Sequence, residues 1–475
     1  MPNKTKQNKK TEINAPIVEA LKTAFNNPTY QFHIPGHTKG LGTLSDFRNL
    51  VGKRALKVDT TDEFDGLGTL NPATGPIKEA QELAAQAFGA KKTFFLLNGS
   101  TIGNLAIAMG LTKQGQKVIV NRNCHRSILT GLIISGAEPV WVCPNRVEDW
   151  SIWGNVEAAK IEELLQKDKD ISLVWITNPT YEGIVSDIKS ISAVCKKYSV
   201  PLVVDEAHGC LWNFSKHLPE TALKLGADAV VHSLHKTGGS MSQTSMLHIS
   251  KDSCLDEVSV EKALKLLHTT SPSLLLLASL DAARANLQSE KGQKLIQRAV
   301  SNAKYLRTRL DNIPNLHQLK GDFGYKTDVT KVFIKIDGLS GKRLESILEI
   351  DFKIEVESAS DIGVLILCNL GNKRSDFKYL ADALEKIAST HYHDVYYLEK
   401  RKHMPMLEPQ IKMSLRDAFY APKERINKKD AIGRISAEVV AECPPGISIL
   451  LPGELITSEH LPYLNDYETL EVVKG

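Results

Sequence analysis

The sequence has no long apolar run, no paired cysteines and no excess of charge of one sign, and each absence excludes a class of protein. A helix that spans a bilayer takes about 20 consecutive apolar residues, so we do not expect a membrane protein. The seven cysteines are odd in number and scattered, without a C-x-x-C pair, which argues against a disulfide framework and a zinc site. We expect a cytoplasmic protein that binds no metal.

The charged residues are evenly mixed, and the phosphate-binding patterns of nucleotide sites are missing. Lys and Arg number 59 against 55 Asp and Glu, interspersed along the chain, so no nucleic-acid surface is indicated. Without G-x-G-x-x-G or a Walker P-loop, neither a dinucleotide site nor an ATP site is predicted. Residues 1–10 are rich in lysine but lack a following apolar segment, so we predict a solvated tail. A tail that binds acidic partners is the alternative.

Between residues 93 and 250 the sequence alternates short β-branched or aromatic runs with helical patterns. This alternation predicts an α/β domain with a mostly parallel central sheet covered by helices. The predicted strands are Thr93–Leu97, Lys117–Val120, Val140–Val142, Ile171–Thr177, Leu202–Asp205, Ala229–Ser233 and Thr244–Ile249. The predicted helices run to Leu111 after the turn at Asn98–Thr101, from Ser127 to Ser135 and from Ile188 to Tyr198.

A change of composition near residue 285 indicates a second, smaller α+β domain. Its predicted elements are a helix over Glu290–Leu310, a strand over Lys331–Ile336, a helix over Lys342–Leu348, strands over Lys353–Glu357 and Gly363–Leu367, and a helix over Phe377–Ile387. The chain exceeds the ~250 to 300 residues at which a single core stops growing. We therefore predict an N-terminal segment (1–55), a large domain (56–288), a small domain (289–400) and a C-terminal module (401–475).

Polar residues gather at the ends of the predicted strands, where parallel sheets place their ligand sites. Asn98-Gly-Ser-Thr101 joins a strand to a helix, so its hydroxyls and free N–H groups could cradle an anion, although Ser and Thr are also common helix caps. Asp205 ends a buried strand, where a carboxylate needs a partner such as a pyridinium nitrogen. A helix cap or a metal ligand is the alternative for Asp205.

Lys236, in Ser233-Leu-His-Lys236, also ends an apolar strand. A buried lysine with a lowered pKa is a nucleophile toward aldehydes, whereas the simpler alternative is a surface lysine at a strand end. His125 follows another strand and could stack on an aromatic cofactor, or could be structural. Thr270, in Thr269-Thr-Ser-Pro272, could contact a phosphate or belong to a helix cap.

The order of hydroxyl cradle, histidine, acid and lysine resembles the ornithine/lysine/arginine decarboxylase family, whose members are pyridoxal phosphate (PLP) enzymes of the aspartate-aminotransferase fold, fold type I. The resemblance covers nearly the whole chain. The segments that carry it are His33–His37, Gly68–Gln81, Phe88–Ala90, Asn98–Thr101, Arg122–His125, Asn178–Tyr181, Asp205–Gly209, His235–Thr237 and Gln243–Ser245.

The resemblance implies a role for each residue of the cofactor site. Ser100 and Thr101 would hold the phosphate, His125 would stack on the ring, Asp205 would pair with the ring nitrogen, and Lys236 would carry PLP as a Schiff base.

The resemblance also implies further contacts and a second subunit. Ser233 would add a phosphate contact, His208 and His235 would flank the cofactor, and Thr270 would reach the phosphate of the other subunit of a homodimer or higher oligomer with shared active sites. Lys236 or His235 would return a proton to Cα of the substrate.

The implied reaction is PLP-dependent decarboxylation of a basic amino acid, with arginine favoured over lysine and lysine over ornithine. The alternatives are an aminotransferase or aldolase-like PLP enzyme, a catalytically silent PLP-binding homologue, and a PLP-free binding protein. The sequence offers four acidic candidates for reading the substrate side chain, and spacing selects none of them: Asp59, Glu63, Asp65 and Glu454.

Some features depart from the family pattern. The receiver-like N-terminal domain of the large members is missing from this sequence, which places it in the compact branch. Thr38 stands where a second basic residue is expected, and Cys210 and Trp212 add bulk after the Asp205–Gly209 run, so both places could affect substrate choice.

Overall fold

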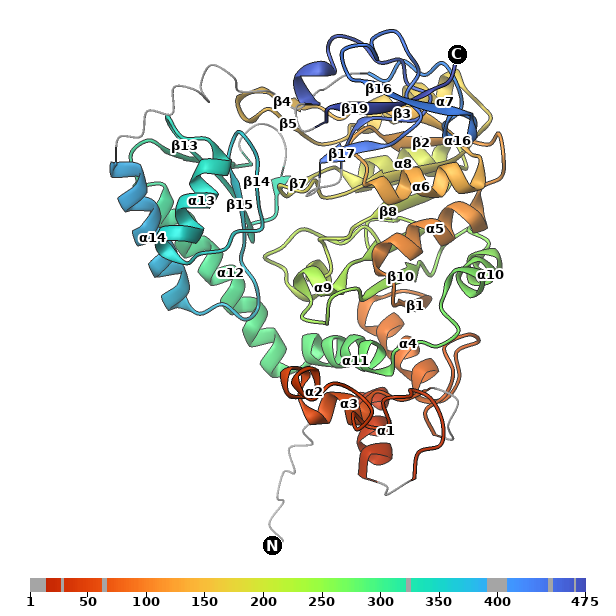
Figure 1. Ribbon diagram of the computed structural model, residues 1–475, viewed down its shortest axis with the longest axis vertical. Coiled ribbons are helices and arrows are strands. Elements are labelled where there is room, and N and C mark those ends of the chain that lie inside the picture. The colour runs from red at the N-terminus through yellow and green to blue at the C-terminus, as the bar shows by residue number, and fades with distance from the viewer. Residues whose placement is uncertain are drawn as a thin grey trace, which may run out of the picture.

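The computed structural model describes residues 14–26, 30–61, 66–321, 326–390, 408–442, 447–464 and 467–475. Its centre is a seven-stranded sheet in the order β1-β10-β9-β8-β6-β2-β3 (Figure 1). The strands are β1 (Lys92–Leu96), β2 (Lys117–Asn121), β3 (Glu138–Val142), β6 (Ile171–Thr177), β8 (Leu202–Asp205), β9 (Ala229–His232) and β10 (Ser245–Ile249). Each lies within two residues of the predicted bounds.

The sheet is mostly parallel, and this prediction is confirmed. Strands β3, β2, β6, β8 and β9 pair in parallel, whereas β10 runs antiparallel to both β9 and β1. The apolar pattern of the sequence does not predict this reversal. Because β10 is reversed, β1 points in the same direction as β9, and the carboxyl ends of β1, β2, β6, β8 and β9 lie along one edge of the sheet.

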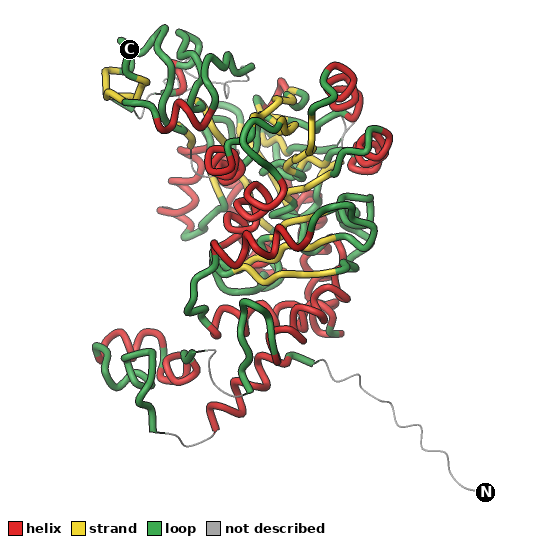
Figure 2. The backbone as a smooth tube through the Cα atoms, turned by 90° about the vertical axis from the view of Figure 1, so that its right-hand side faces the viewer, coloured by secondary structure: helices red, strands yellow, loops and turns green. Residues whose placement is uncertain are grey.

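Helices cover both faces of the sheet, which is why its strands are apolar on both sides. Val174 and Val204 face one core, whereas their chain neighbours Trp175 and Val203 face the other. On the first side lie α4 (Gly75–Phe88), α7 (Ala158–Lys167), α8 (Ile188–Lys197) and α11 (Leu274–Gln288). On the second side lie α5 (Gly99–Leu111), α6 (Arg126–Ser135) and α10 (Glu257–Leu267). Figure 2 shows the strands between these two helical layers.

The N-terminal helices α1 (Pro16–Asn26), α2 (Ser45–Val51) and α3 (Lys53–Val58) lie at one end of the molecule (Figure 1). Helix α1 packs on α4 and α11, and its Ile17 lies in the same core as the sheet. The buried carboxylate of Asp281 accepts a hydrogen bond from the Ile17 amide at 2.9 Å, and Arg284 pairs with Asp281 and donates to the carbonyl of Asn14 at 2.8 Å. A buried ion pair therefore anchors the start of α1 to α11.

Helix α12 (Glu290–Leu310) connects the large and small domains and has the predicted bounds. Its first turns place Ile296 and Val300 in the core of the large domain, and its later turns place Leu306 and Leu310 in a separate core. That second core lies against an antiparallel sheet in the order β11-β13-β15-β14. Its elements are β11 (Leu316–Gln318), β13 (Lys331–Ile336), α13 (Gly341–Phe352), β14 (Ser358–Ala359), β15 (Val364–Leu367) and α14 (Arg374–Ser389).

The predicted strand over Lys353–Glu357 is wrong. Lys353 adopts a left-handed conformation, with φ of 56°, that ends α13, and the chain then runs irregularly to the short strand β14. Ile354 and Val356 nevertheless pack against the small core, so the alternating apolar pattern reports burial and not ladder pairing.

The C-terminal module lies at the opposite end of the molecule from α1 (Figures 1 and 2). It contains α16 (Leu415–Tyr420), which packs on α6, and two small antiparallel sheets, β16-β19 and β17-β18. Its strands are β16 (Lys423–Asn427), β17 (Val440–Glu442), β18 (Ile447–Leu450) and β19 (Thr469–Val473). Short elements elsewhere are β4 (Arg146–Val147), β5 (Ile152–Trp153), β7 (Ile184–Val185), β12 (Lys326–Thr327), α9 (Leu234–Thr237) and the 3-10 turns Glu148–Trp150, Trp212–Phe214 and Leu461–Tyr463.

Candidate active site

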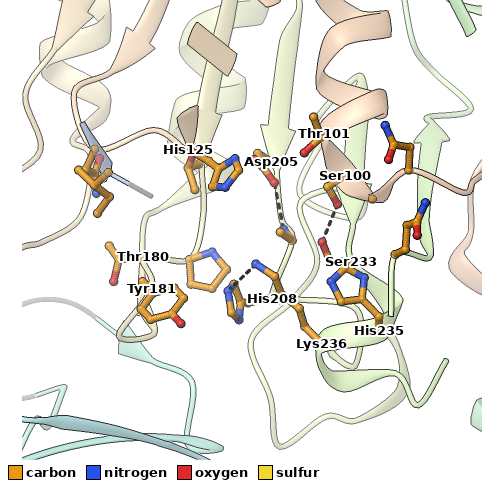
Figure 3. Close-up of a pocket in the computed structure, with 18 residues that line it drawn as sticks. Ser100, Thr101, His125, Thr180, Tyr181, Asp205, His208, Ser233, His235 and Lys236 are labelled. Carbon is orange, nitrogen blue, oxygen red and sulfur yellow. Dashed lines mark hydrogen bonds between the residues drawn. The ribbon is translucent and has the colours of Figure 1, made fainter. Parts of the chain in front are cut away.

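A pocket of about 290 Å³ lies at the edge where the parallel strands end (Figure 3). Its lining comes from the segments that follow β1, β2, β6, β8 and β9, together with one residue each from the turn before β10 and from β18. The lining residues are Asn98, Gly99, Ser100, Thr101, Asn123, His125, Thr177, Pro179, Thr180, Tyr181, Asp205, Ala207, His208, Ser233, His235, Lys236, Gln243 and Ile447. Every predicted site residue except Thr270 belongs to this set.

Hydroxyl groups form one wall of the pocket at the start of α5. Gly99 has φ of 68° and donates its amide to the carbonyl of Gln243 at 2.8 Å, which turns the chain from β1 into the helix. The Ser100 hydroxyl lies 2.6 Å from that of Ser233 and 3.3 Å from that of Ser245. The Ser100 side chain therefore does not cap α5. The first amides of α5 and this hydroxyl pair could together hold an anion.

Asp205 supplies a buried carboxylate at the end of β8. It is 2% exposed, and it accepts hydrogen bonds from Asn104 Nδ2 at 3.0 Å and from the Ala207 amide at 3.2 Å. The same Asn104 amide donates to Ser127 Oγ at 2.9 Å. Asn104 was missed in the sequence, although a single asparagine inside the apolar helix α5 is a signal of a buried polar contact. Asp205 is thus fixed in place by two neutral donors, the Asn104 side chain and the Ala207 amide.

His125 follows β2 and both caps α6 and lines the pocket. Its Nδ1 accepts a hydrogen bond from the Ser127 amide at 3.2 Å and lies 2.8 Å from Ser127 Oγ. Because Nδ1 accepts from a backbone N–H, the neutral ring carries its proton on Nε2. Burial lowers the pKa of His125, which keeps the ring uncharged at neutral pH.

Lys236 reaches into the pocket from the short helix α9, where Figure 3 shows it pointing toward His208. Its Nζ lies 2.9 Å from His208 Nε2. Burial lowers the pKa of Lys236, while Asp205 and Glu357 act in the opposite direction. Burial, and then the charges of Lys331 and Lys236, hold the pKa of His208 well below its usual value. The pocket therefore combines a neutral imidazole with a lysine that loses its proton more readily than one in water.

His235, beside Lys236, has a fixed orientation. Its Nδ1 donates to the carbonyl of Thr244 at 2.7 Å, and burial lowers its pKa. The neutral ring therefore has its only N–H in this bond, and its Nε2 can accept a proton but cannot donate one.

Tyr181 lines the pocket and pairs with Glu357, an exposed residue of the small domain that lies outside the pocket lining. The Tyr181 hydroxyl donates to Glu357 Oε1 at 2.7 Å, and the Tyr181 ring packs edge-on against His208 with centroids 5.3 Å apart. Glu357 is the last residue of the irregular segment between α13 and β14, so its place beside a strand end of the other domain could not be predicted from local pattern. It is a carboxylate that sequence reasoning missed.

Several predicted residues lie away from the pocket. Thr270 is exposed before α11, whose cap is Ser273. Cys210 and Trp212 are buried instead of lining the pocket: Cys210 Sγ lies 3.0 Å from Thr237 Oγ1, and Trp212 Nε1 donates to Asp328 Oδ2 at 2.7 Å. Their bulk therefore fills the core below α9.

Of the four acidic candidates for the substrate side chain, the two that the structure describes, Asp59 and Glu454, do not line the pocket. Glu454 is fully buried and accepts the Leu451 amide at 3.0 Å, near Arg122 and His460. Asp59 lies 3.2 Å from His37. Glu63 and Asp65 fall outside the described residues, as does Cys443.

Among the residues that the structure describes, no cluster of three or more His, Cys, Asp or Glu side chains is arranged to hold a metal ion. Within those same ranges, no helix combines the length and the apolar composition that crossing a membrane requires.

Comparison with known proteins was made on the sequence and on the structure. Residues 15–334 match the family described as Orn/Lys/Arg decarboxylase, major domain, and residues 398–472 match its C-terminal domain. Arginine decarboxylase of Bacillus subtilis is 37% identical over 457 residues, which are 94% of this chain and 92% of that protein. Constitutive lysine decarboxylase of Escherichia coli is 24% identical over 551 residues, with 94% of this chain and 76% of that protein covered.

Among solved structures, the lysine decarboxylase LdcF of Francisella novicida has a TM-score of 0.85 and 20% sequence identity. The match covers 98% of this chain and 82% of that one. At this identity the likeness concerns the fold alone, which this chain shares with that structure.

Proposed function

The chain belongs to the Orn/Lys/Arg decarboxylase family, and from this premise and the pocket we propose that it decarboxylates a basic L-amino acid with PLP as cofactor. The observation that carries the proposal is the half-buried Lys236 amine, whose pKa is lowered by burial and which lines the same pocket as the Asp205 carboxylate and the Ser100–Ser233 hydroxyl pair. An aldehyde cofactor with a phosphate and a basic ring nitrogen needs these three groups.

The donor set fits PLP. Ser100, Thr101 and Ser233 would hold its phosphate at the start of α5, Asp205 would meet the ring nitrogen, and the flat His125 ring would lie against the cofactor. When bound through Lys236, PLP supplies an electron sink for the pair that the departing carboxylate leaves on Cα. His208 and His235 would flank this position as neutral rings.

The hydrogen bonds in the pocket also indicate which residue would return the proton to Cα of the substrate. Lys236 is our candidate for returning the proton to Cα, in preference to His235, because the only N–H of neutral His235 is already donated to Thr244. His208, 2.9 Å from Lys236 Nζ and uncharged at neutral pH, orients the amine without adding a competing positive charge. Release of CO₂ then leaves an amine product with one carbon less.

The substrate side chain would be read by Glu357. Its carboxylate is held by the Tyr181 hydroxyl at the side of the pocket away from the phosphate cradle, where the distal cation of a basic amino acid would end. We favour arginine over lysine and lysine over ornithine, because the arginine decarboxylase relative shares more of its sequence with this chain than the lysine decarboxylase relatives do.

The reaction is tested by incubating purified protein and PLP with arginine, lysine and ornithine side by side and measuring CO₂ and the amine. We expect release from at least one of them, with the highest kcat/KM for arginine. An amino-group exchange with a 2-oxo acid and no CO₂ would identify an aminotransferase instead. A protein that gains no visible absorbance with PLP would rule out the cofactor.

We further propose that the chain forms at least a homodimer with shared active sites. Residues 30–51 present large apolar side chains to solvent in the single chain, among them Phe32 at 97%, Leu50 at 83% and Leu41 at 77% exposed. Such a surface is typical of an interface. Thr270 is exposed as well, as a residue that serves the partner's site must be. Sedimentation should give at least twice the 52.4 kDa of one chain, and an active monomer would contradict the proposal.

A further inference from the structure

A second buried lysine, Lys331, lies behind the wall of the pocket. It is the first residue of β13 in the small domain and is only 2% exposed. Its Nζ donates to the main-chain carbonyl of Tyr181 at 2.5 Å. The stem of the side chain covers Gly183, where an added Cβ would come within 2.9 Å of Lys331 Cβ and where φ is 100°. The Lys331 side chain therefore packs in the space that the missing side chain of Gly183 leaves open.

Burying an ammonium group costs free energy, so we expect the buried Lys331 to do more than stabilise the fold. Burial lowers the pKa of Lys331 to about 8, although the nearby carboxylates of Asp328, Glu182 and Glu357 oppose the shift. The group remains mostly charged at pH 7 and meets the Tyr181 carbonyl as a charged donor, a stronger hydrogen bond than one between neutral groups.

The two domains are already joined at this place without Lys331. Strand β12 pairs with β7, and the Asp328 amide donates to the carbonyl of Gly183 at 2.8 Å. Asp328 in turn accepts from Trp212 Nε1 at 2.7 Å. The additional contacts of Lys331 Nζ both fall on Tyr181: Nζ donates to the main-chain carbonyl and lies over the ring, 5.2 Å from its centroid.

Tyr181 is one member of the Tyr181–Glu357 pair that is proposed to bind the distal cation of the substrate. The Tyr181 ring lines the pocket, packs against His208 and donates its hydroxyl to Glu357. We propose that Lys331 is a positioning residue: by holding the Tyr181 carbonyl it sets where the Tyr181–Glu357 pair receives the distal cation of the substrate. The inference rests on the proposed function and adds a residue that does not line the pocket.

The experiment compares Lys331→Met with Glu357→Gln and with the double variant. Methionine keeps most of the stem without the charge, so the variant should fold. We expect each single variant to raise KM for arginine about tenfold, with kcat within about threefold of the wild type, because an interaction with the bound substrate is lost and the chemistry is kept. The double variant should be no worse than Glu357→Gln, because both changes disable one pair.

Two further readouts separate positioning from general damage. The dissociation constant of agmatine, measured from the change in absorbance of the PLP-loaded protein, should rise by the same factor as KM. The matched control is Trp212→Phe, which breaks a bond at the same domain junction without touching Tyr181; it should lower the melting temperature and leave KM unchanged. Lys331→Gln, a second variant that retains a neutral donor, should raise KM less than methionine does.

The outcomes distinguish the two proposals. A wild-type protein that releases no CO₂ from any basic amino acid removes the proposed function, and the inference falls with it. A wild type that turns over while Lys331→Met keeps the wild-type KM removes the inference alone. Effects on KM that multiply in the double variant, or a Trp212→Phe variant that reproduces the rise in KM, would likewise show that Lys331 does not act through Glu357.

Discussion

Replacing Lys236 with alanine should reduce kcat for decarboxylation by at least about 10⁴-fold. The amine is our candidate both for attaching PLP and for returning the proton to Cα, so the change would remove covalent attachment and acid catalysis together. The protein mixed with PLP should also lose its visible absorbance band, and borohydride should no longer fix the cofactor to the chain. Both are read by spectroscopy and by the mass of the reduced protein.

The control for this prediction is a lysine outside the pocket. Lys92 pairs on the surface with Glu261 at 2.6 Å, so Lys92→Ala should keep colour and turnover. The melting temperature of the cofactor-free Lys236→Ala protein should stay near that of the cofactor-free wild type, because the variant removes a desolvated amine and no core packing. If Lys236→Ala retained colour and more than about a hundredth of the activity, another lysine would be the attachment site.

Asp205→Asn should reduce kcat by about 10³-fold, the effect of removing a preorganised charge from the reacting centre. The variant should fold, because the side chain at position 205 can keep both of its contacts, with donor and acceptor exchanged in the one to Asn104. The new amide oxygen can face the Ala207 amide, and its NH₂ can face Asn104 after that side chain rotates to present its otherwise unpartnered Oδ1. The Asp205→Asn variant therefore loses the negative charge at this position while the shape of the side chain is retained.

This explanation can be tested with a cofactor analogue. N1-methyl pyridoxal phosphate carries a permanent positive charge on its ring nitrogen and needs no carboxylate to stay cationic. It should restore part of the activity of Asp205→Asn and none of that of Lys236→Ala. A variant that the analogue leaves unchanged would assign Asp205 a purely structural role.

The large sheet could be predicted from the sequence because each strand is a short apolar run closed by polar residues, and both faces are buried. Ile171–Thr177 and Leu202–Asp205 have the predicted bounds. The strand predicted at Lys353–Glu357 failed for the opposite reason, since its alternating pattern is satisfied by packing on the small core without a ladder partner. The reversal of β10 leaves no local trace, because a buried strand is apolar whichever way it runs.

The site likewise contains some residues that could be predicted from the sequence and others that could not. Residues at the ends of successive strands, such as His125, Asp205 and Lys236, were predictable because parallel topology brings those ends to one edge. Glu357 and Lys331 were not, because they come from the small domain and meet the pocket through contacts of 150 residues or more in sequence separation. Glu454, attractive for its place in a turn, proves to be an internal partner of the C-terminal module.

Because β10 lies between β9 and β1 in the sheet, the pocket can form only after β10 has been synthesised. The hydroxyl pair joins residues 133 apart, and in the described sheet β1 is bound through β10, the last of the seven strands to be made. A nascent chain that stops before Ser245 contains Asp205, His125 and Lys236 but lacks β10, the strand that pairs with β1. The hydroxyl pair proposed to hold the cofactor phosphate can therefore form only after all seven strands have been made, so that PLP would bind to a sheet that has already closed.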